Sequence, residues 1–272
     1  MRVLALLFAL LSLAGCGSSE ESDDRATVVA GFYPLAWAAE RIGGPGTRVV
    51  NLTQAGAEPH DLELSPRDVA AIRDAELVVY VGGGLQPSLE DAVASREGSS
   101  LDVLRVGDDP HVWLDPVRFA AIAREIGAAL GRPVPASRLA DDLGALDEEF
   151  RAGVDQCERR TLVTTHAAFG LLATRYGLTE LPLAGRSPEA EPSPKDVERL
   201  IEAIRDSGAT TVFSEPLVSD RLAETVAREA DAEVAVLDPI EGLSQERLDA
   251  GEDYFSVMRS NLTQLREALG CR

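Results

Sequence analysis

The chain alternates between short β-branched strands and helical segments, and it does so in two separate stretches. Alternation of this kind favours a parallel sheet that is covered by helices and connected by right-handed crossovers. The predicted strands span residues 27–30, 48–52, 76–81, 160–165, 210–214 and 233–238. We therefore expect an α/β fold that consists of two lobes, each with its own parallel sheet.

A long helical pattern separates the two stretches. After a predicted helix at 116–130, a second helix at 135–156 carries one apolar stripe that can pack against both lobes. Its roughly 20 residues would span about 30 Å. A single stiff helix between two lobes permits only small rocking motions. The predicted boundaries are 26–130 for the N-terminal lobe, 131–157 for the connecting helix and 158–272 for the C-terminal lobe.

The N-terminus has the pattern of an export signal. A basic start is followed by the apolar run 3–13 and by Leu-Ala-Gly-Cys ending at Cys16. The run is too short for a membrane-spanning helix, which needs about 20 apolar residues. We predict a signal peptide at 1–15, a lipid anchor on Cys16 and a flexible tether at 16–25, which would hold the protein outside the cytoplasm. An ordinary secretory signal with an unrelated cysteine is the alternative.

The charge balance argues against polyanionic partners. With 46 acidic and 26 basic residues, the formal net charge is −20. Such a chain is not expected to bind nucleic acid or a membrane through a polybasic surface. Cations would be attracted, although the charge alone could equally serve solubility.

Two cysteines remain beyond the N-terminal anchor, Cys157 and Cys271. An oxidising exterior permits them to form a disulfide. This bond would close a loop of more than 100 residues and contribute on the order of 4 kcal/mol in the chain-entropy model. The alternative is two free thiols.

The whole chain contains only three histidines, and each stands in a predicted loop. His60 follows the second strand, His111 precedes the helix at 116–130, and His166 ends the strand at 160–165. Ligands of open α/β sheets bind beyond the carboxyl ends of the strands. A lone loop histidine is usually a surface hydrogen-bonding residue. Three in such places together predict a metal site that is lined from both lobes.

Three imidazoles and one carboxylate form a tetrahedral site that suits Zn²⁺. Asp238 ends a predicted strand, as His166 does, and is the first candidate for the fourth ligand. Glu215 and Glu58 are the alternatives. Either of them could instead accept the second N–H of a ligating imidazole and so fix its tautomer.

At these residues the chain resembles the zinc- and manganese-binding proteins of bacterial ABC uptake systems, the ZnuA-like and TroA-like members of the cluster A-I family. The segments that carry the resemblance are Pro59-His60-Asp61, Asp-Pro-His-Val-Trp-Leu-Asp-Pro at 109–116, Thr-Thr-His-Ala-Ala-Phe-Gly at 164–170, Phe-Ser-Glu-Pro at 213–216 and Leu-Asp-Pro at 237–239. The resemblance implies that the metal ligands are His60, His111, His166 and Asp238. It also implies a monomeric lipoprotein without enzymatic activity that delivers its cargo to an ABC permease.

The identity of the cargo is predicted from the third ligand. Members that resemble manganese binders often carry a carboxylate where this chain has His166, and imidazole favours Zn²⁺ over Mn²⁺. The chain departs from many zinc-type members because the segment 85–108 contains no histidine-rich loop. Two other functions fit a three-histidine site: a zinc hydrolase with water in the fourth position, and an adhesin-like surface protein that the metal stabilises.

Overall fold

The computed structural model describes residues 25–104, 109–186 and 193–272. The predicted signal peptide at 1–15, the anchor Cys16 and all of the tether except its last residue lie outside the described residues. Within those ranges, no helix has the length and apolar character that crossing a membrane requires.

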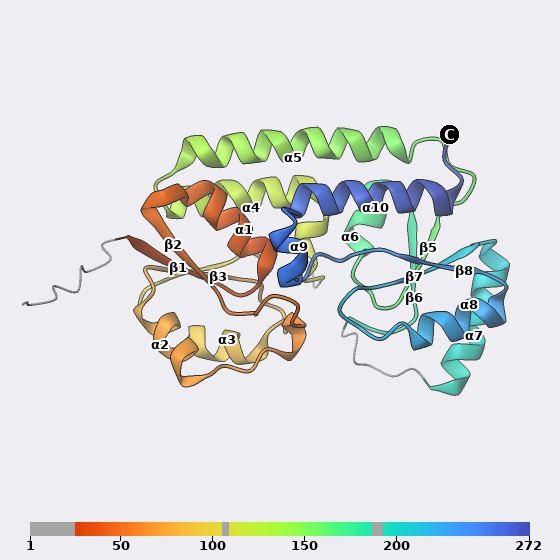
Figure 1. Cartoon of the computed structure of the whole chain (residues 1–272), viewed down its shortest axis with the longest axis horizontal. Coiled ribbons are helices and arrows are strands. Elements are labelled where there is room, and N and C mark those ends of the chain that lie inside the picture. Colours follow the sequence, from red (N-terminus) through yellow and green to blue (C-terminus); the bar gives the residue numbers. More distant parts are fainter. Residues whose placement is uncertain (1–24, 105–108, 187–192) are drawn as a thin grey trace, which may run out of the picture.

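Two parallel four-stranded sheets form the centres of two lobes (Figure 1). The first sheet has the order β2-β1-β3-β4 and the second the order β6-β5-β7-β8, so the two lobes share one topology. The predicted two-lobed α/β fold is confirmed. The strands are β1 Ala26–Ala30, β2 Thr47–Asn51, β3 Leu77–Tyr80, β4 Ser99–Asp102, β5 Thr161–Thr164, β6 Thr179–Pro182, β7 Thr211–Ser214 and β8 Glu233–Val236.

Helices surround the sheets, and several begin at residues that satisfy their first backbone N–H groups. Ser65 and Ser193 each form a reciprocal capping box with the aspartate three residues later. The helices are α1 Tyr33–Gly43, α2 Pro66–Asp74, α3 Pro87–Ala94, α4 Pro116–Ala129, α5 Pro133–Gly153, α6 Gly170–Arg175, α7 Pro194–Ser207, α8 Arg221–Ala230, α9 Gln245–Asp249 and α10 Tyr254–Leu269.

Several of these elements are not predicted by the strand and helix pattern. The strands β4 and β6 read Ser-Ser-Leu-Asp and Thr-Glu-Leu-Pro. Both lie at one edge of their sheet, where a partly exposed strand does not need a continuous apolar run. The helices α3 and α10 are also additions to the predicted fold.

The helix α5 extends across both lobes (Figure 1). It begins at Pro133, two residues before the predicted start, because proline is well accommodated in the first helical turn. It ends at Gly153, earlier than the predicted residue 156.

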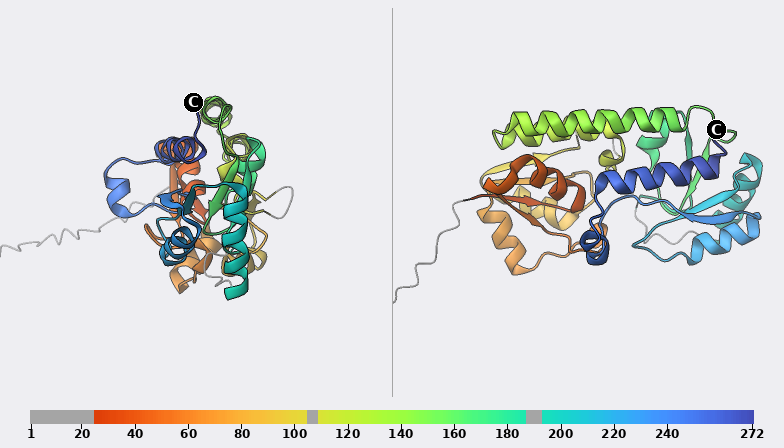
Figure 2. Two further views of the ribbon diagram at one scale, coloured as in Figure 1. Left: turned by 90° about the vertical axis from the view of Figure 1, so that its right-hand side faces the viewer. Right: turned by 45° about the horizontal axis from the view of Figure 1, so that its top comes forward.

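The C-terminal helix α10 also connects the lobes, so the joint contains two helices instead of the one that was predicted (Figure 2). At its N-terminal end, Asp253 pairs with Arg41 at 2.8 Å, and Phe255 packs edge-on against Trp37 of α1. Farther along, Arg259 pairs with Glu149 of α5 at 2.8 Å. After α10, Cys271 forms a disulfide with Cys157, which lies just beyond α5. The ends of the two bridging helices are therefore tied together.

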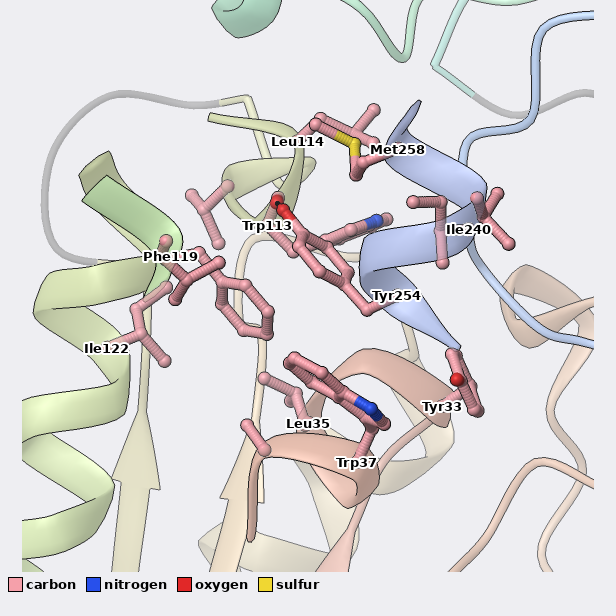
Figure 3. Packing of buried hydrophobic residues seen from close by; sticks show 14 of the residues in the cluster. Tyr33, Leu35, Trp37, Trp113, Leu114, Phe119, Ile122, Ile240, Tyr254 and Met258 are labelled. Carbon is pink, nitrogen blue, oxygen red and sulfur yellow. Dashed lines mark hydrogen bonds between the residues drawn. The ribbon is translucent and has the colours of Figure 1, made fainter. Parts of the chain in front are cut away.

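A continuous apolar core fills the space between the lobes (Figure 3). Trp113 is fully buried at its centre, and its Nε1–H donates to the Pro239 carbonyl at 2.7 Å. The Tyr254 hydroxyl in turn donates to the Trp113 carbonyl at 2.6 Å. Buried polar groups are costly unless they are hydrogen-bonded, and both of these groups are satisfied. The core thus places the segment after His111 directly against the segment after β8.

An ion-pair network lies beside this core. Asp147 of α5 is almost completely buried and accepts hydrogen bonds from Arg175, Arg151 and the Tyr176 hydroxyl. Burial opposes ionisation of Asp147, but these partners outweigh it and lower its pKa to about 2. Arg175 also lies 3.4 Å from Asp115. The network therefore connects α5, the C-terminal lobe and the segment that follows His111.

Candidate metal centre

The N-terminal lobe contributes His60 from a short 3-10 turn, Pro59–Asp61, in the long connection after β2. The Glu58 carboxylate accepts from the backbone N–H of His60 at 3.2 Å and so caps this turn. The fully buried Gln86 side chain donates to the Pro59 carbonyl at 3.3 Å. These contacts direct the imidazole to the boundary between the lobes, where its Nε2 lies 3.3 Å from Glu241 Oε1.

The same lobe contributes His111, which is fully buried just before the 3-10 turn Val112–Leu114. The Asp109 carboxylate contacts both the backbone N–H and the ring of His111, at 3.0 and 2.9 Å. Because Asp109 accepts at Nδ1, the His111 Nε2 atom is left to face the other lobe. It lies 3.3 Å from Nε2 of His166.

The C-terminal lobe contributes His166, two residues beyond the end of β5. Its Nδ1 contacts the Glu215 carboxylate at 2.7 Å, and its backbone N–H donates to the same carboxylate at 3.2 Å. The Thr165 hydroxyl donates to Glu215 as well. Glu215 thus takes the role of an imidazole acceptor, which is one of the two roles considered for it from the sequence.

The fourth group in the cluster is Glu241, which is not among the ligands predicted from the sequence. One ligand atom from each of His60, His111, His166 and Glu241 lies within 4.8 Å of the others. Glu241 is 1% exposed, and its Oε1 lies 3.3 to 3.5 Å from the three Nε2 atoms.

Asp238 is placed differently from the expectation. Its carboxylate pairs with Arg247 at 2.7 Å and accepts from the Ile240 backbone N–H at 2.7 Å. Asp238 lies two residues beyond the end of β8, and both of its carboxylate oxygen atoms are engaged by these partners. The structure therefore brings Glu241, and not Asp238, to the three imidazoles.

Four of the six donor-to-donor distances fit a tetrahedral ion, and the two between His60 and the other histidines are within 4.8 Å. Zinc bonds of 2.0–2.2 Å imply donor-to-donor distances of about 3.4 Å in a regular tetrahedron. The contacts of Glu241 Oε1 with His60, His111 and His166 measure 3.3, 3.3 and 3.5 Å, and His111 and His166 are 3.3 Å apart. Two donors come from each lobe, so a bound ion would sit between them.

The charges in this cluster are strongly coupled. Burial opposes the protonation of His166, but hydrogen bonds to Glu215 and Glu241 outweigh it and raise its pKa to about 10. The pKa of His111 is also raised, because Asp109 and Glu241 overcome the same burial effect. Burial opposes ionisation of Glu241, yet the histidines hold its pKa well below the usual value. Without metal, protons on the imidazoles therefore balance the Glu241 charge.

Glu58 adds a second carboxyl beside the cluster. Burial raises the pKa of Glu58 to about 8, and the neighbouring Glu241 charge adds to this effect. A hydrogen bond joins the two carboxyl groups. A carboxyl that is protonated near neutral pH can donate to an anionic neighbour, so Glu58 supports Glu241 in its ionised form.

Comparison with known proteins agrees with a metal site of this geometry. The model of the ZnuA family, described as the periplasmic zinc-uptake complex component A, matches residues 28–268. The chain belongs to the ZnuA family.

Individual relatives place the chain within the ZnuA family. The zinc-binding lipoprotein AdcA of Streptococcus pneumoniae is 32% identical over 98% of this chain, which spans 61% of the length of AdcA. The high-affinity zinc uptake system protein ZnuA of Bacillus subtilis is 30% identical, over 98% of this chain and 96% of that protein.

Among solved structures, the laminin-binding protein Lmb of Streptococcus agalactiae has a TM-score of 0.79 and 28% sequence identity. The match covers 90% of this chain and 99% of Lmb, which is described as a bifunctional protein with adhesin and metal-transporting activity. The likeness to the fold of Lmb therefore extends over nearly the whole described chain.

Proposed function

We propose that this chain is the extracytoplasmic binding component of an ABC importer, and that it captures Zn²⁺ and delivers it to a membrane permease. The observation that carries the proposal is the set of four donor atoms within 4.8 Å of one another, two from each lobe, with His60 partly exposed and the other three residues buried. Three imidazoles and a carboxylate suit zinc, whereas manganese prefers oxygen ligands. The names of AdcA and of Bacillus ZnuA support the same cargo.

His60, His111, His166 and Glu241 are the proposed ligands. Asp109 and Glu215 would hold the Nδ1–H groups of their histidines and keep each Nε2 lone pair directed at the ion. Binding requires neutral imidazoles, so zinc must displace the imidazole protons of the metal-free protein, that of His166 above all. The Glu241 charge then stabilises the ion in place of those protons.

The lipid on Cys16 would keep the protein at the membrane, next to its permease. The name of AdcA as a lipoprotein supports this anchor. The two bridging helices and the shared core leave little freedom for the lobes to separate. Release of the ion would therefore depend on contact with the permease, which separates the two pairs of ligands.

A hydrolytic function is less well supported by the geometry. A catalytic zinc ion keeps one position for water, but Glu241 supplies a fourth donor at ligand spacing. The names of AdcA and ZnuA are those of binding and uptake proteins.

Attachment to host surfaces is a second candidate, because Lmb is described as both an adhesin and a metal transporter. In an adhesin in which the metal is structural, the metal-free form should unfold. In a capture protein, the metal-free form should remain folded and bind zinc again.

The proposal is tested by calorimetric titration of the purified metal-free protein with Zn²⁺ and with Mn²⁺, combined with circular dichroism before and after metal removal. We expect one tight zinc site, weaker manganese binding and a folded metal-free state. Deletion of the gene in the organism that carries it should slow the uptake of ⁶⁵Zn²⁺ by its cells. Absence of a single zinc site would contradict the proposal, and tighter manganese binding would change the cargo.

A further inference from the structure

We propose that Asn261 of α10, together with Asp238, positions the Glu241 carboxylate and thereby controls the affinity of the metal site. This inference rests on the proposed function, and it assigns a role to two buried polar residues that do not belong to the four-residue cluster. Neither residue is a ligand in this account. Both are positioning residues, because they act on the ion through Glu241.

Asn261 clamps the backbone at the end of the last strand. Its side chain is 2% exposed, and it forms two hydrogen bonds with the main chain of Asp238. The Asp238 backbone N–H donates to Asn261 Oδ1 at 2.9 Å, and Asn261 Nδ2 donates to the Asp238 carbonyl at 2.7 Å. The Asn261 amide thus satisfies the backbone groups of Asp238 as a neighbouring strand would. It thereby fixes where the chain leaves β8.

Asp238 then fixes the turn that follows. Its Oδ1 accepts from the Ile240 backbone N–H, and its Oδ2 pairs with Arg247. Arg247 also pairs with Glu252 at 2.9 Å, just before α10. The carboxylate is nearly buried and is fully engaged by these partners. Asp238 thereby stabilises the turn between β8 and Glu241, and Glu241 supplies the negative charge at the metal centre.

The turn itself has an unusual backbone conformation. Ile240 has a φ of +56°, in the left-handed region that β-branched residues rarely adopt. Its side chain is fully buried in the core between the lobes, to which Met258 of α10 also belongs (Figure 3). Such a conformation persists only when the surroundings determine it. The contacts of Asp238 and the burial of Ile240 provide these surroundings.

The loop after Glu241 passes close to the other lobe. A side chain at Gly242 would lie 3.3 Å from the Ala57 carbonyl, and the Gly56 backbone N–H donates to the Leu243 carbonyl at 3.0 Å. Glu241 therefore lies between a clamp on α10 and a contact with the His60 loop. Small shifts of the clamp should move the carboxylate relative to the imidazoles.

The experiment is a double-mutant cycle between Asn261→Leu and Glu241→Gln, read as zinc affinity by chelator competition. Residues that support a metal ligand typically change affinity by about 10- to 100-fold. We expect Asn261→Leu to weaken zinc binding by about that amount in the native background. In the Glu241→Gln background it should weaken binding less than about threefold, because the positioned ligand is already lost.

Two further variants complete the test. Asn261→Asp keeps the acceptor for the Asp238 N–H but places a second acceptor against the Asp238 carbonyl, and it should weaken zinc binding by about tenfold. It covers the case in which Asn261→Leu does not fold. Ser260→Ala, at the exposed neighbouring position on α10, is the matched control and should leave the affinity unchanged. The visible spectrum of the Co²⁺ complex should change in the Asn261 variants but not in the control.

The outcomes separate this inference from the proposed function. Failure of the native protein to bind zinc would overturn the function on which the inference rests. Native zinc binding and a loss in Glu241→Gln, with unchanged affinity in both Asn261 variants, would overturn the inference alone. Equal losses from Asn261→Leu in both backgrounds would also overturn it, because Asn261 would then act independently of Glu241.

Discussion

The two halves of the metal centre are held in different ways. In the N-terminal lobe, His60 and His111 each donate their backbone N–H to a carboxylate only two residues earlier, Glu58 or Asp109. In the C-terminal lobe, His166 is held by Glu215, 49 residues away, and the loop of Glu241 is held by Asn261, which lies 23 residues after Asp238. The first half is organised by local contacts, whereas the second half depends on the assembled lobe.

This difference concerns how the ligands are positioned and not how many bonds they form. If all four donors bind one ion, each half should contribute similarly to affinity, although the halves should respond differently to changes outside the site. Substitutions in each half, and outside the site, can distinguish the two kinds of support.

Removal of one imidazole from either half should produce the largest loss. Zinc sites with four protein ligands are stabilised by about 10–16 kcal/mol in total, so one ligand accounts for roughly a hundred- to a thousand-fold in affinity. We expect His111→Ala and His166→Ala to lose zinc affinity to a similar extent, measured by competition with a chelator. A large loss in only one of the two variants would show that the two halves do not contribute similarly to zinc affinity.

The carboxylates should separate into a ligand and a supporting residue. Glu241→Gln removes a charged donor, and we expect about a hundredfold loss of zinc affinity. Glu215→Gln has the same change in charge, but the amide oxygen can still accept from His166 Nδ1. We therefore expect only about a tenfold loss, as is typical for residues that orient a ligand.

The matched pair makes this prediction easy to contradict. Both substitutions remove one negative charge from a nearly buried position. Equal losses would show that charge alone determines the affinity. A larger loss in Glu215→Gln would exchange the roles that the geometry assigns.

The affinity should fall as the pH falls. The pKa of His166 is raised to about 10 in the metal-free protein, so this imidazole holds a proton near neutral pH, and the pKa of His111 is raised as well. Each displaced proton changes the apparent affinity by about tenfold per pH unit. Calorimetry at pH 7 in buffers of different ionisation enthalpy should detect the release of at least one proton, that of His166. No proton release would contradict the charge balance proposed for the empty site.

Removal of the disulfide should lower the stability of the protein. It should have the smallest effect on zinc affinity of the changes considered. The bond between Cys157 and Cys271 spans 114 residues and joins the ends of α5 and α10. Its removal in Cys157→Ser/Cys271→Ser should lower the free energy of unfolding by up to about 5 kcal/mol. Zinc affinity should change less than about threefold, because the site is held by other contacts. Thermal unfolding and zinc titration of the same sample measure both quantities.

A large loss of zinc affinity in this double variant would mean that the tie between the bridging helices controls the site. Such a result would show that the whole metal centre, and not only its C-terminal half, depends on contacts between distant parts of the chain.

The sequence was sufficient for the three histidines, although His166 belongs to the half of the site that depends on the assembled lobe. His60 and His111 stand in loops with a carboxylate two residues before each of them, and His166 follows a clear strand. The alternation of strands and helices also predicted both sheets. These features depend on periodicity and on short-range contacts, which are visible in one sequence.

The fourth position was not predictable in the same way. Asp238 lies two residues beyond the end of β8, and its side chain is taken by Arg247 and by the Ile240 N–H. The choice of Glu241 depends on the left-handed backbone of Ile240 and on the clamp from Asn261. The clamp belongs to α10, a helix that the pattern of alternation does not predict.

The most direct test of the central claim is X-ray absorption at the zinc edge of the one-to-one complex, recorded for the native protein and for Glu241→Gln. We predict four light ligands at about 2.0–2.1 Å, with the outer scattering of three imidazoles, and an altered oxygen contribution in the variant. Sulfur ligation, a shell of oxygen atoms without imidazole scattering, or an unchanged spectrum in Glu241→Gln would contradict a centre built from three histidines and Glu241.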